Sequence, residues 1–150
     1  MTYEELNVVR NLKKKLDAEV NKLSALRDLV RPATTKFTRE TVDGKSYTCL
    51  DVMPHGTNTA SPTETLATMI TDAERRIANL KRRIENESLT LANKIQAEVQ
   101  DAKEQALLIH RYISCKHFRD IGFAMGISEA NVYFSHRKIL KKLIVADSSL

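Results

Sequence analysis

The side chains between residues 128 and 142 have the types and the spacing to bind DNA. Glu129, Asn131 and Arg137 can hydrogen-bond to base edges in a major groove, and the lysines that follow suit either phosphate contacts or simple solvation of a terminal helix. Four positive side chains stand against one Glu between residues 129 and 143. The candidate DNA-binding residues are Ser128, Glu129, Ala130, Asn131, Tyr133, Phe134, Arg137, Lys138, Lys141 and Lys142.

Other kinds of chemistry find no support in the residue pattern. Cys49, His55, Cys115 and His117 lack the close pairing of zinc ligands, so the sequence predicts no metal site and no cofactor. The two cysteines also imply no disulfide framework. The sequence shows no Ser/His/Asp grouping, phosphate-cradling glycine loop or paired carboxylates. We therefore do not expect an enzyme.

The distribution of charge favours an anionic partner near the C-terminus. The chain has 150 residues and a formal charge of +5. Residues 101–150 supply +3 of this, from eight Lys and Arg against five Asp and Glu. A surplus of this size fits double-stranded DNA. Because no apolar run could span a membrane and residues 1–5 do not resemble a signal peptide, we expect cytoplasmic residence and no membrane partner.

Three short helices are predicted to position the candidate residues. Asp101 followed by Glu104 is a capping-box pattern, which begins a helix that reaches Ile113. A polar turn over residues 114–116 follows. The second helix then spans about residues 117–125, and its core-facing side chains are Phe118, Ile121 and Met125.

A tight turn should join the second helix to the third. Gly126 suits a left-handed helix end, Ile127 is expected to fill the core beneath the turn, and Ser128 is a preferred N-cap. Close packing here needs a small residue at Gly122 or Ala124. The third helix turns Val132, Ile139, Leu140 and Leu143 inward and leaves Tyr133 and Phe134 outward, where a ring can contact thymine methyls or sugars. The plainer alternative is an ordinary three-helix core with a glycine turn.

Two long helices are predicted ahead of this region. Residues 3–31 and 63–99 carry apolar side chains at three- and four-residue steps among many charged ones, which is typical of coiled-coil strands. Pro32 should end the first helix at Arg31. The core-facing positions are Leu12, Leu16, Val20, Leu23, Leu26 and Val30 in the first helix and Ile70, Ala73, Ile77, Leu80, Ile84, Leu91 and Ile95 in the second.

The predicted fold is all-α, in two domains. Residues 1–100 form a long antiparallel coiled-coil helical hairpin with a connecting loop at 32–62, and residues 101–150 form a three-helix helix-turn-helix domain. Within the loop Asp43-Gly44 favours a two-residue turn, so a small β-hairpin and an irregular loop are both open. The sequence also leaves open whether the coiled coil closes within one chain or makes a homodimer.

The C-terminal motif resembles the helix-turn-helix of sigma-70 region 4. It reads Arg111-Tyr-Ile113, then Phe118-Arg-Asp-Ile121-Gly-Phe-Ala-Met125-Gly126-Ile127-Ser128, then Val132 and Leu140-Lys-Lys-Leu143. With the coiled coil and the Met53-Pro-His-Gly56 loop, the layout is similar to phage-encoded late-gene transcriptional regulators of the ArpU/RinA type. The chain departs from the family in having Phe118 where Trp is frequent and Gly122 where Ala is commoner.

The resemblance and the residue pattern together predict a DNA-binding transcription regulator. The resemblance implies an activator of phage late genes that works near a promoter in the bacterial host cytoplasm, with RNA polymerase as a second partner. The alternative is a coiled-coil interaction protein that docks on RNA polymerase or another protein without reading a DNA sequence.

Overall fold

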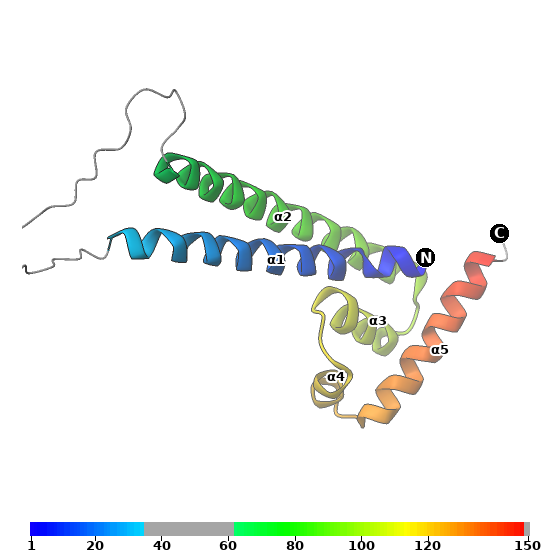
Figure 1. The fold of residues 1–150 in the computed structure, drawn as a ribbon. Coiled ribbons are helices and arrows are strands. Elements are labelled where there is room, and N and C mark those ends of the chain that lie inside the picture. Colours follow the sequence, from blue (N-terminus) through cyan, green and yellow to red (C-terminus); the bar gives the residue numbers. More distant parts are fainter. Residues whose placement is uncertain (35–61, 149–150) are drawn as a thin grey trace, which may run out of the picture. The chain divides into compact units, whose positions relative to one another are not determined.

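A computed structural model describes residues 1–34 and 62–148, and every element in this part of the chain is a helix. In order these are α1 (Tyr3–Thr34), α2 (Pro62–Glu98), α3 (Ala102–Leu108), the π-helical turn η1 (Ile109–Ile113), α4 (Phe118–Met125) and α5 (Glu129–Ser148) (Figure 1). The all-α prediction is confirmed for these residues. The segment around Asp43-Gly44, for which a hairpin and an irregular loop were both open, lies outside them, as do Cys49 and His55.

The helices contribute to two compact units. One unit comprises residues 1–17 and 78–150, and the other comprises residues 18–77. Both α1 and α2 pass from one unit into the other. This division differs from the domain boundary at residue 100 given in the sequence analysis. The first turns of α1 and the last turns of α2 share one hydrophobic core with α3, α4 and α5.

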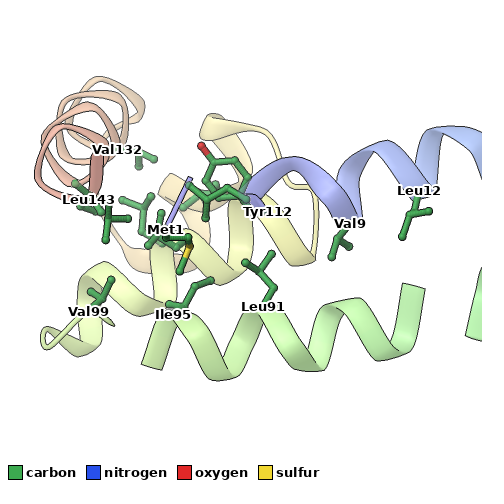
Figure 2. Packing of buried hydrophobic residues seen from close by; sticks show 14 of the residues in the cluster. Met1, Val9, Leu12, Leu91, Ile95, Val99, Tyr112, Val132 and Leu143 are labelled. Atoms are coloured by element: carbon green, nitrogen blue, oxygen red, sulfur yellow. The ribbon is translucent and has the colours of Figure 1, made fainter. Parts of the chain in front are cut away.

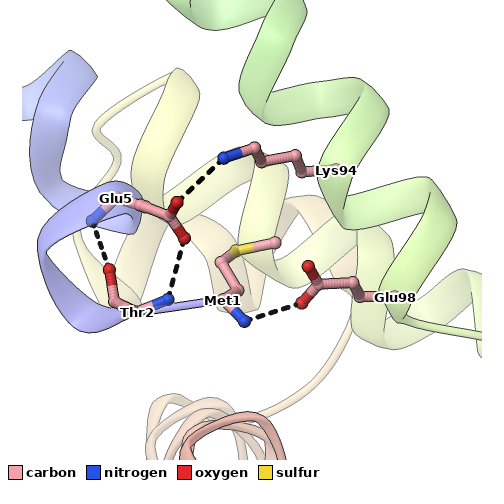
Figure 3. A network of polar contacts seen from close by, with 5 residues as sticks. All are labelled: Met1, Thr2, Glu5, Lys94 and Glu98. Atoms are coloured by element: carbon pink, nitrogen blue, oxygen red, sulfur yellow. Dashed lines mark hydrogen bonds and ion pairs between the residues drawn. The ribbon is translucent and has the colours of Figure 1, made fainter. Parts of the chain in front are cut away.

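The start of α1 carries a reciprocal cap that also binds it to α2 (Figure 3). Thr2 Oγ1 accepts from the Glu5 N–H at 3.2 Å, and Glu5 Oε2 accepts from the Thr2 N–H at 2.9 Å. Lys94 Nζ donates to Glu5 Oε1 at 2.9 Å, which lowers the pKa of the Glu5 carboxyl. The amino group of Met1 lies 3.0 Å from Glu98 Oε2. Partner numbers fall along α2 as they rise along α1, so the two helices run antiparallel here.

The larger unit is held together by a cluster of buried apolar side chains (Figure 2). Its least exposed members, at 2% or below, come from every helix of the unit: Leu6, Val9, Ile95, Leu107, Leu108, Tyr112, Ile121, Val132 and Ile139. Burial of such a side chain stabilises a fold by about 1.5–3 kcal/mol. The N-terminal turns of α1 therefore belong to the core against which α5 packs.

In the smaller unit α1 packs on α2 through a thinner apolar seam. The buried side chains are Leu23, Leu26, Ala73 and Ile77. Arg27 Nη2 lies 2.9 Å from Glu74 Oε1, and Arg76 Nε lies 3.3 Å from Glu19 Oε2. These pairs are largely exposed and each contributes little to stability. They run in opposite order along the two helices, so this pairing is also antiparallel.

Two details of the first helix differ from prediction. Val20 is 44% exposed. It follows Leu12 by two four-residue steps, which rotate it about 80° around the axis to the edge of the apolar stripe. The second detail is that α1 continues to Thr34 instead of ending at Arg31. Pro32 lacks one hydrogen-bond donor, but its own φ is close to the helical value, so the last turn can form.

The predicted helix that starts at Asp101 changes pitch halfway. Asp101 caps α3 as expected, since its Oδ1 accepts from the Lys103 N–H at 3.0 Å. After Leu108 the chain forms η1, in which the Ser114 N–H donates to the Ile109 carbonyl at 3.0 Å. The wider turn lets Tyr112 join the core together with Leu107 and Leu108.

Candidate nucleic-acid interface

The junction of α4 and α5 has the local geometry that the sequence predicts. Gly126 adopts the left-handed conformation, with φ 70° and ψ 30°, and its N–H donates to the Gly122 carbonyl. The Ile127 N–H donates to the same carbonyl at 3.0 Å. Ser128 Oγ then accepts from the Asn131 N–H at 3.2 Å, which caps α5. Backbone hydrogen bonds thus fix the turn to the end of α4, and a side-chain hydrogen bond fixes it to the start of α5.

Gly122 is the small residue on which close packing of this turn depends. It is buried, and a Cβ atom added there would lie 2.7 Å from the carbonyl oxygen of Ile127. Ala124, the other residue considered from the sequence, is exposed. The prediction that Ile127 fills the core is wrong, because its side chain is 37% exposed. Val132, which is fully buried, is among the side chains that fill the core instead.

All ten candidate residues are exposed on and just before α5. The opposite side of the helix carries the buried Val132, Ile139 and Leu143, as expected. Four candidates follow one another at four-, three- and four-residue steps, which places them on one stripe pointing away from the core: Ala130, Phe134, Arg137 and Lys141. We call these four residues the central stripe.

On the side of α5 that faces α4, Tyr133 is held in place by an aromatic contact. Its ring meets the ring of Phe118 edge to face, with centroids 5.9 Å apart. Glu129 lies one turn before Tyr133 on the same side. Tyr133 therefore flanks the central stripe with a restricted orientation, whereas the Phe134 side chain is 65% exposed.

Asn131, Lys138 and Lys142 lie on the side of α5 that faces α3, whereas Ser128 caps the helix. Lys142 Nζ is 3.1 Å from Glu104 Oε1, so its charge is partly neutralised. Asn131 and Lys138 line a hollow of about 670 Å³ between α3 and α5, and Phe134 borders it. The ten predicted residues thus do not form one uniform face, because the structure divides them among the central stripe and its two flanks.

Two residues of α4 belong to this region but escaped prediction. Phe123 is 78% exposed, and the guanidinium carbon of Arg119 lies 6.0 Å from its ring centroid. Both line a hollow of about 400 Å³ together with Ser128 and Glu129. Their four-residue spacing, on the face of α4 opposite Ile121, was the available signal in the sequence.

A half-buried histidine, His136, also lies on α5 beside this surface. The His136 Nε2 and Tyr112 Oη atoms are joined by a hydrogen bond of 2.8 Å, and the His136 ring lies 5.2 Å from Phe118. Burial lowers the pKa of His136 to about 4 and raises that of Tyr112 to about 12. Both groups are therefore uncharged at neutral pH, so His136 adds no positive charge to α5. The guanidinium of Arg111 covers Phe118 at 4.3 Å.

Comparison with known proteins found no relative. No protein-family model matches the chain, and no curated protein or solved structure matches it significantly. None of the described helices has both the length and the apolar character needed to cross a membrane. Within the described ranges no three His, Cys, Asp or Glu side chains are grouped so that they could hold a metal ion.

Proposed function

We propose that this protein is a DNA-binding transcription regulator in which α4, residues 126–128 and α5 form a helix-turn-helix. One observation carries the proposal. After the closed turn, α5 packs on the core through Val132 and Ile139. The opposite side of its first turns carries exposed charged and aromatic side chains. In a helix-turn-helix, the N-terminal residues of the second helix contact base edges in the major groove.

Each outward side chain suits a particular contact. Arg137 can donate two hydrogen bonds to a guanine, and Phe134 can pack on a thymine methyl group. Lys141, one turn farther along the same stripe, suits a backbone phosphate. Arg119 on α4 lies beside the start of α5 and suits a phosphate on the flanking strand, since the first helix of such a motif crosses the backbone.

The resemblance to sigma-70 region 4 and to ArpU/RinA-type regulators supports a narrower proposal. The protein activates phage late genes near a promoter, in the cytoplasm of a bacterial host, with RNA polymerase as a further partner. The concentration of positive charge in residues 101–150 supports the DNA-binding part of this proposal. Pairing of two chains through the α1–α2 region would set two recognition helices at a fixed spacing on a palindromic site.

Fluorescence anisotropy with duplexes selected from random sequence tests the proposal. The parent protein should bind with an affinity that falls steeply with salt, because phosphate contacts release counterions. Arg137→Ala should weaken binding to the selected site by about 5- to 150-fold, the equivalent of about 1–3 kcal/mol. Glu129→Ala and Asn131→Ala should change which bases are preferred. Arg75→Ala, at an exposed cation of α2, is the control and should bind like the parent.

Absence of binding to any duplex at low salt would contradict the proposal. If the parent binds but all three α5 variants select the same sequences with unchanged affinity, α5 is not the recognition helix. These two outcomes separate the function from the assignment of its surface.

A second candidate function is docking on a protein without sequence-specific DNA contact. The exposed Phe123 ring and the hollow between α3 and α5 favour it, because large apolar side chains on a surface often mark protein contacts. A pull-down of RNA polymerase with and without DNA, repeated with Phe123→Ser, distinguishes the two candidates. Retention that needs Phe123 but no DNA would favour the docking function.

A further inference from the structure

A second positively charged surface lies away from α5, where α1 and α2 meet the turn that follows η1. It is a hollow of about 510 Å³, whose charged lining residues are Arg10, Lys13, Lys14 and Lys81 against Asp17 and Glu85. All of them belong to the compact unit that contains α3, α4 and α5. Four cations against two carboxylates leave this hollow with a net charge of +2, so it favours an anion.

Three of the four cations that line the hollow form no ion pair with a described carboxylate. Nearby in the same unit, Lys94 is paired with Glu5 at 2.9 Å. In contrast, no carboxylate of the described residues lies within 4.0 Å of the cationic atoms of Arg10, Lys14 or Lys81. Lys13 Nζ donates to the Ile113 carbonyl, which fixes this ammonium group at the edge of the hollow. The site therefore holds one anchored cation and three that can turn toward an anion.

The hollow is connected to the proposed DNA-binding surface through a short piece of chain. Cys115 lines the hollow, and α4 begins at Phe118. The Cα atoms of Cys115 and Arg119 are four residue steps apart and therefore at most about 14 Å from each other. Arg119 in turn borders the start of α5. Since each DNA strand carries a phosphate about every 3.4 Å along the helix axis, this limit corresponds to at most about four base pairs.

We propose that this hollow is a second binding site for DNA backbone phosphate, which extends the contact of the regulator beyond the bases that α5 reads. The inference rests on the proposed function. Lys14 and Lys81 supply point charges, and the Arg10 guanidinium can donate two parallel hydrogen bonds to phosphate oxygens. Among the described residues that line the hollow none is aromatic, so a nucleobase has no ring to stack on. This favours a phosphate presented by a duplex over a free nucleotide.

A charge-matched pair of triple variants tests the proposal. The hollow variant carries Arg10→Ala, Lys14→Ala and Lys81→Ala. The control variant carries Lys22→Ala, Arg75→Ala and Arg83→Ala, which removes the same charge from exposed positions that do not line the hollow. Alanine suits helix interiors, so both should fold like the parent, which circular dichroism checks. Affinity for a duplex of about 30 base pairs is then measured by anisotropy between about 50 and about 200 mM salt.

The hollow variant should bind more weakly and with a smaller dependence on salt. Each lost phosphate contact removes about 0.9 from the slope of log affinity against log salt, which is a factor of about 3.5 over this salt range. The control variant should keep the parent's slope. Equal slopes for the hollow variant and the control, while Arg137→Ala still weakens binding, would overturn this inference and leave the proposed function standing.

Two further outcomes also decide the question. No binding by the parent itself would overturn the proposed function and this inference with it. If pyrophosphate raised the melting temperature of the parent but not of the hollow variant, while the DNA salt slopes were equal, the hollow would bind a free phosphate. That result would overturn the assignment to the DNA backbone.

Discussion

A Cβ atom on Gly122 would lie 2.7 Å from the carbonyl oxygen of Ile127. The two residues are also joined in the other direction, since the Ile127 N–H donates to the Gly122 carbonyl at 3.0 Å. The end of α4 and the turn that precedes α5 are therefore in backbone contact. The direction in which α5 leaves the core depends on the absence of a side chain at residue 122.

The first prediction concerns this contact. Gly122→Ala should lower the free energy of unfolding by about 1–3 kcal/mol, because the neighbour is backbone and cannot rotate away. Gly126→Ala is a useful comparison: a Cβ there meets nothing within 4 Å, so only the strain of its positive φ, about 1–2 kcal/mol, applies. Urea unfolding measures both. A Gly122→Ala protein as stable as the parent, with unchanged DNA affinity, would show that the turn adjusts freely.

A second prediction is that stability falls in mildly acidic solution because of His136. Burial lowers its pKa to about 4, against 6.5 for an ordinary histidine. Between these values the unfolded chain binds a proton that the folded chain excludes, so the stabilisation is complete above pH 6.5 and declines as the pH falls toward 4. The full difference corresponds to on the order of 3 kcal/mol.

Urea unfolding at several pH values checks the role of His136. His136→Gln should remove most of the pH dependence in this window, whereas His117→Gln, at an exposed histidine, should leave it unchanged. A parent and a His136→Gln protein with parallel pH profiles would rule out His136 as the source.

A third prediction is that the beginning of α1 supports the C-terminal helices. Leu6 is 1% exposed, in the core that also contains Ile121 and Val132. Leu6→Ala should therefore lower the free energy of unfolding by about 2–5 kcal/mol. Leu29→Ala, at a leucine of the same helix that is 64% exposed, should change it by no more than about 0.5 kcal/mol. Thermal unfolding followed by circular dichroism measures this, and a fragment 101–150 with full helicity and cooperative melting would argue against it.

A fourth prediction separates two neighbouring lysines. Lys141 lies on the central stripe, whereas Lys142 Nζ is held 3.1 Å from Glu104 Oε1. Lys141→Ala should reduce the salt slope of DNA binding by about 1, as expected for one phosphate contact, and Lys142→Ala should reduce it less. Glu104→Gln should increase the contribution of Lys142, which anisotropy with the double variant can measure. Equal effects of both lysine variants in the parent background would contradict the division of α5 into stripe and flank.

Much of the local structure could be predicted because its causes lie within a few residues. Asp101 and Ser128 accept hydrogen bonds from N–H groups two and three residues ahead, and Gly126 is the residue that most readily adopts a positive φ. Apolar side chains at three- and four-residue steps predicted α1, α2 and the buried side of α5. These features follow from helix geometry and glycine sterics, which do not depend on the tertiary structure.

The packing between distant segments could not be predicted in the same way. The apolar pattern predicted that Leu12 is buried, but not that it belongs to the same cluster as Ile121, more than a hundred residues later. The hydrogen bond of His136 with Tyr112, the pair of Lys142 with Glu104 and the exposed Ile127 depend likewise on how helices meet. The choice among such arrangements rests on many small packing energies summed over the whole core, and no short stretch of sequence contains that sum. The helices and their caps are determined by residues close in the sequence. In contrast, the surface around α5 and the basic hollow form because α1 and α2 pack against the same core as α3, α4 and α5.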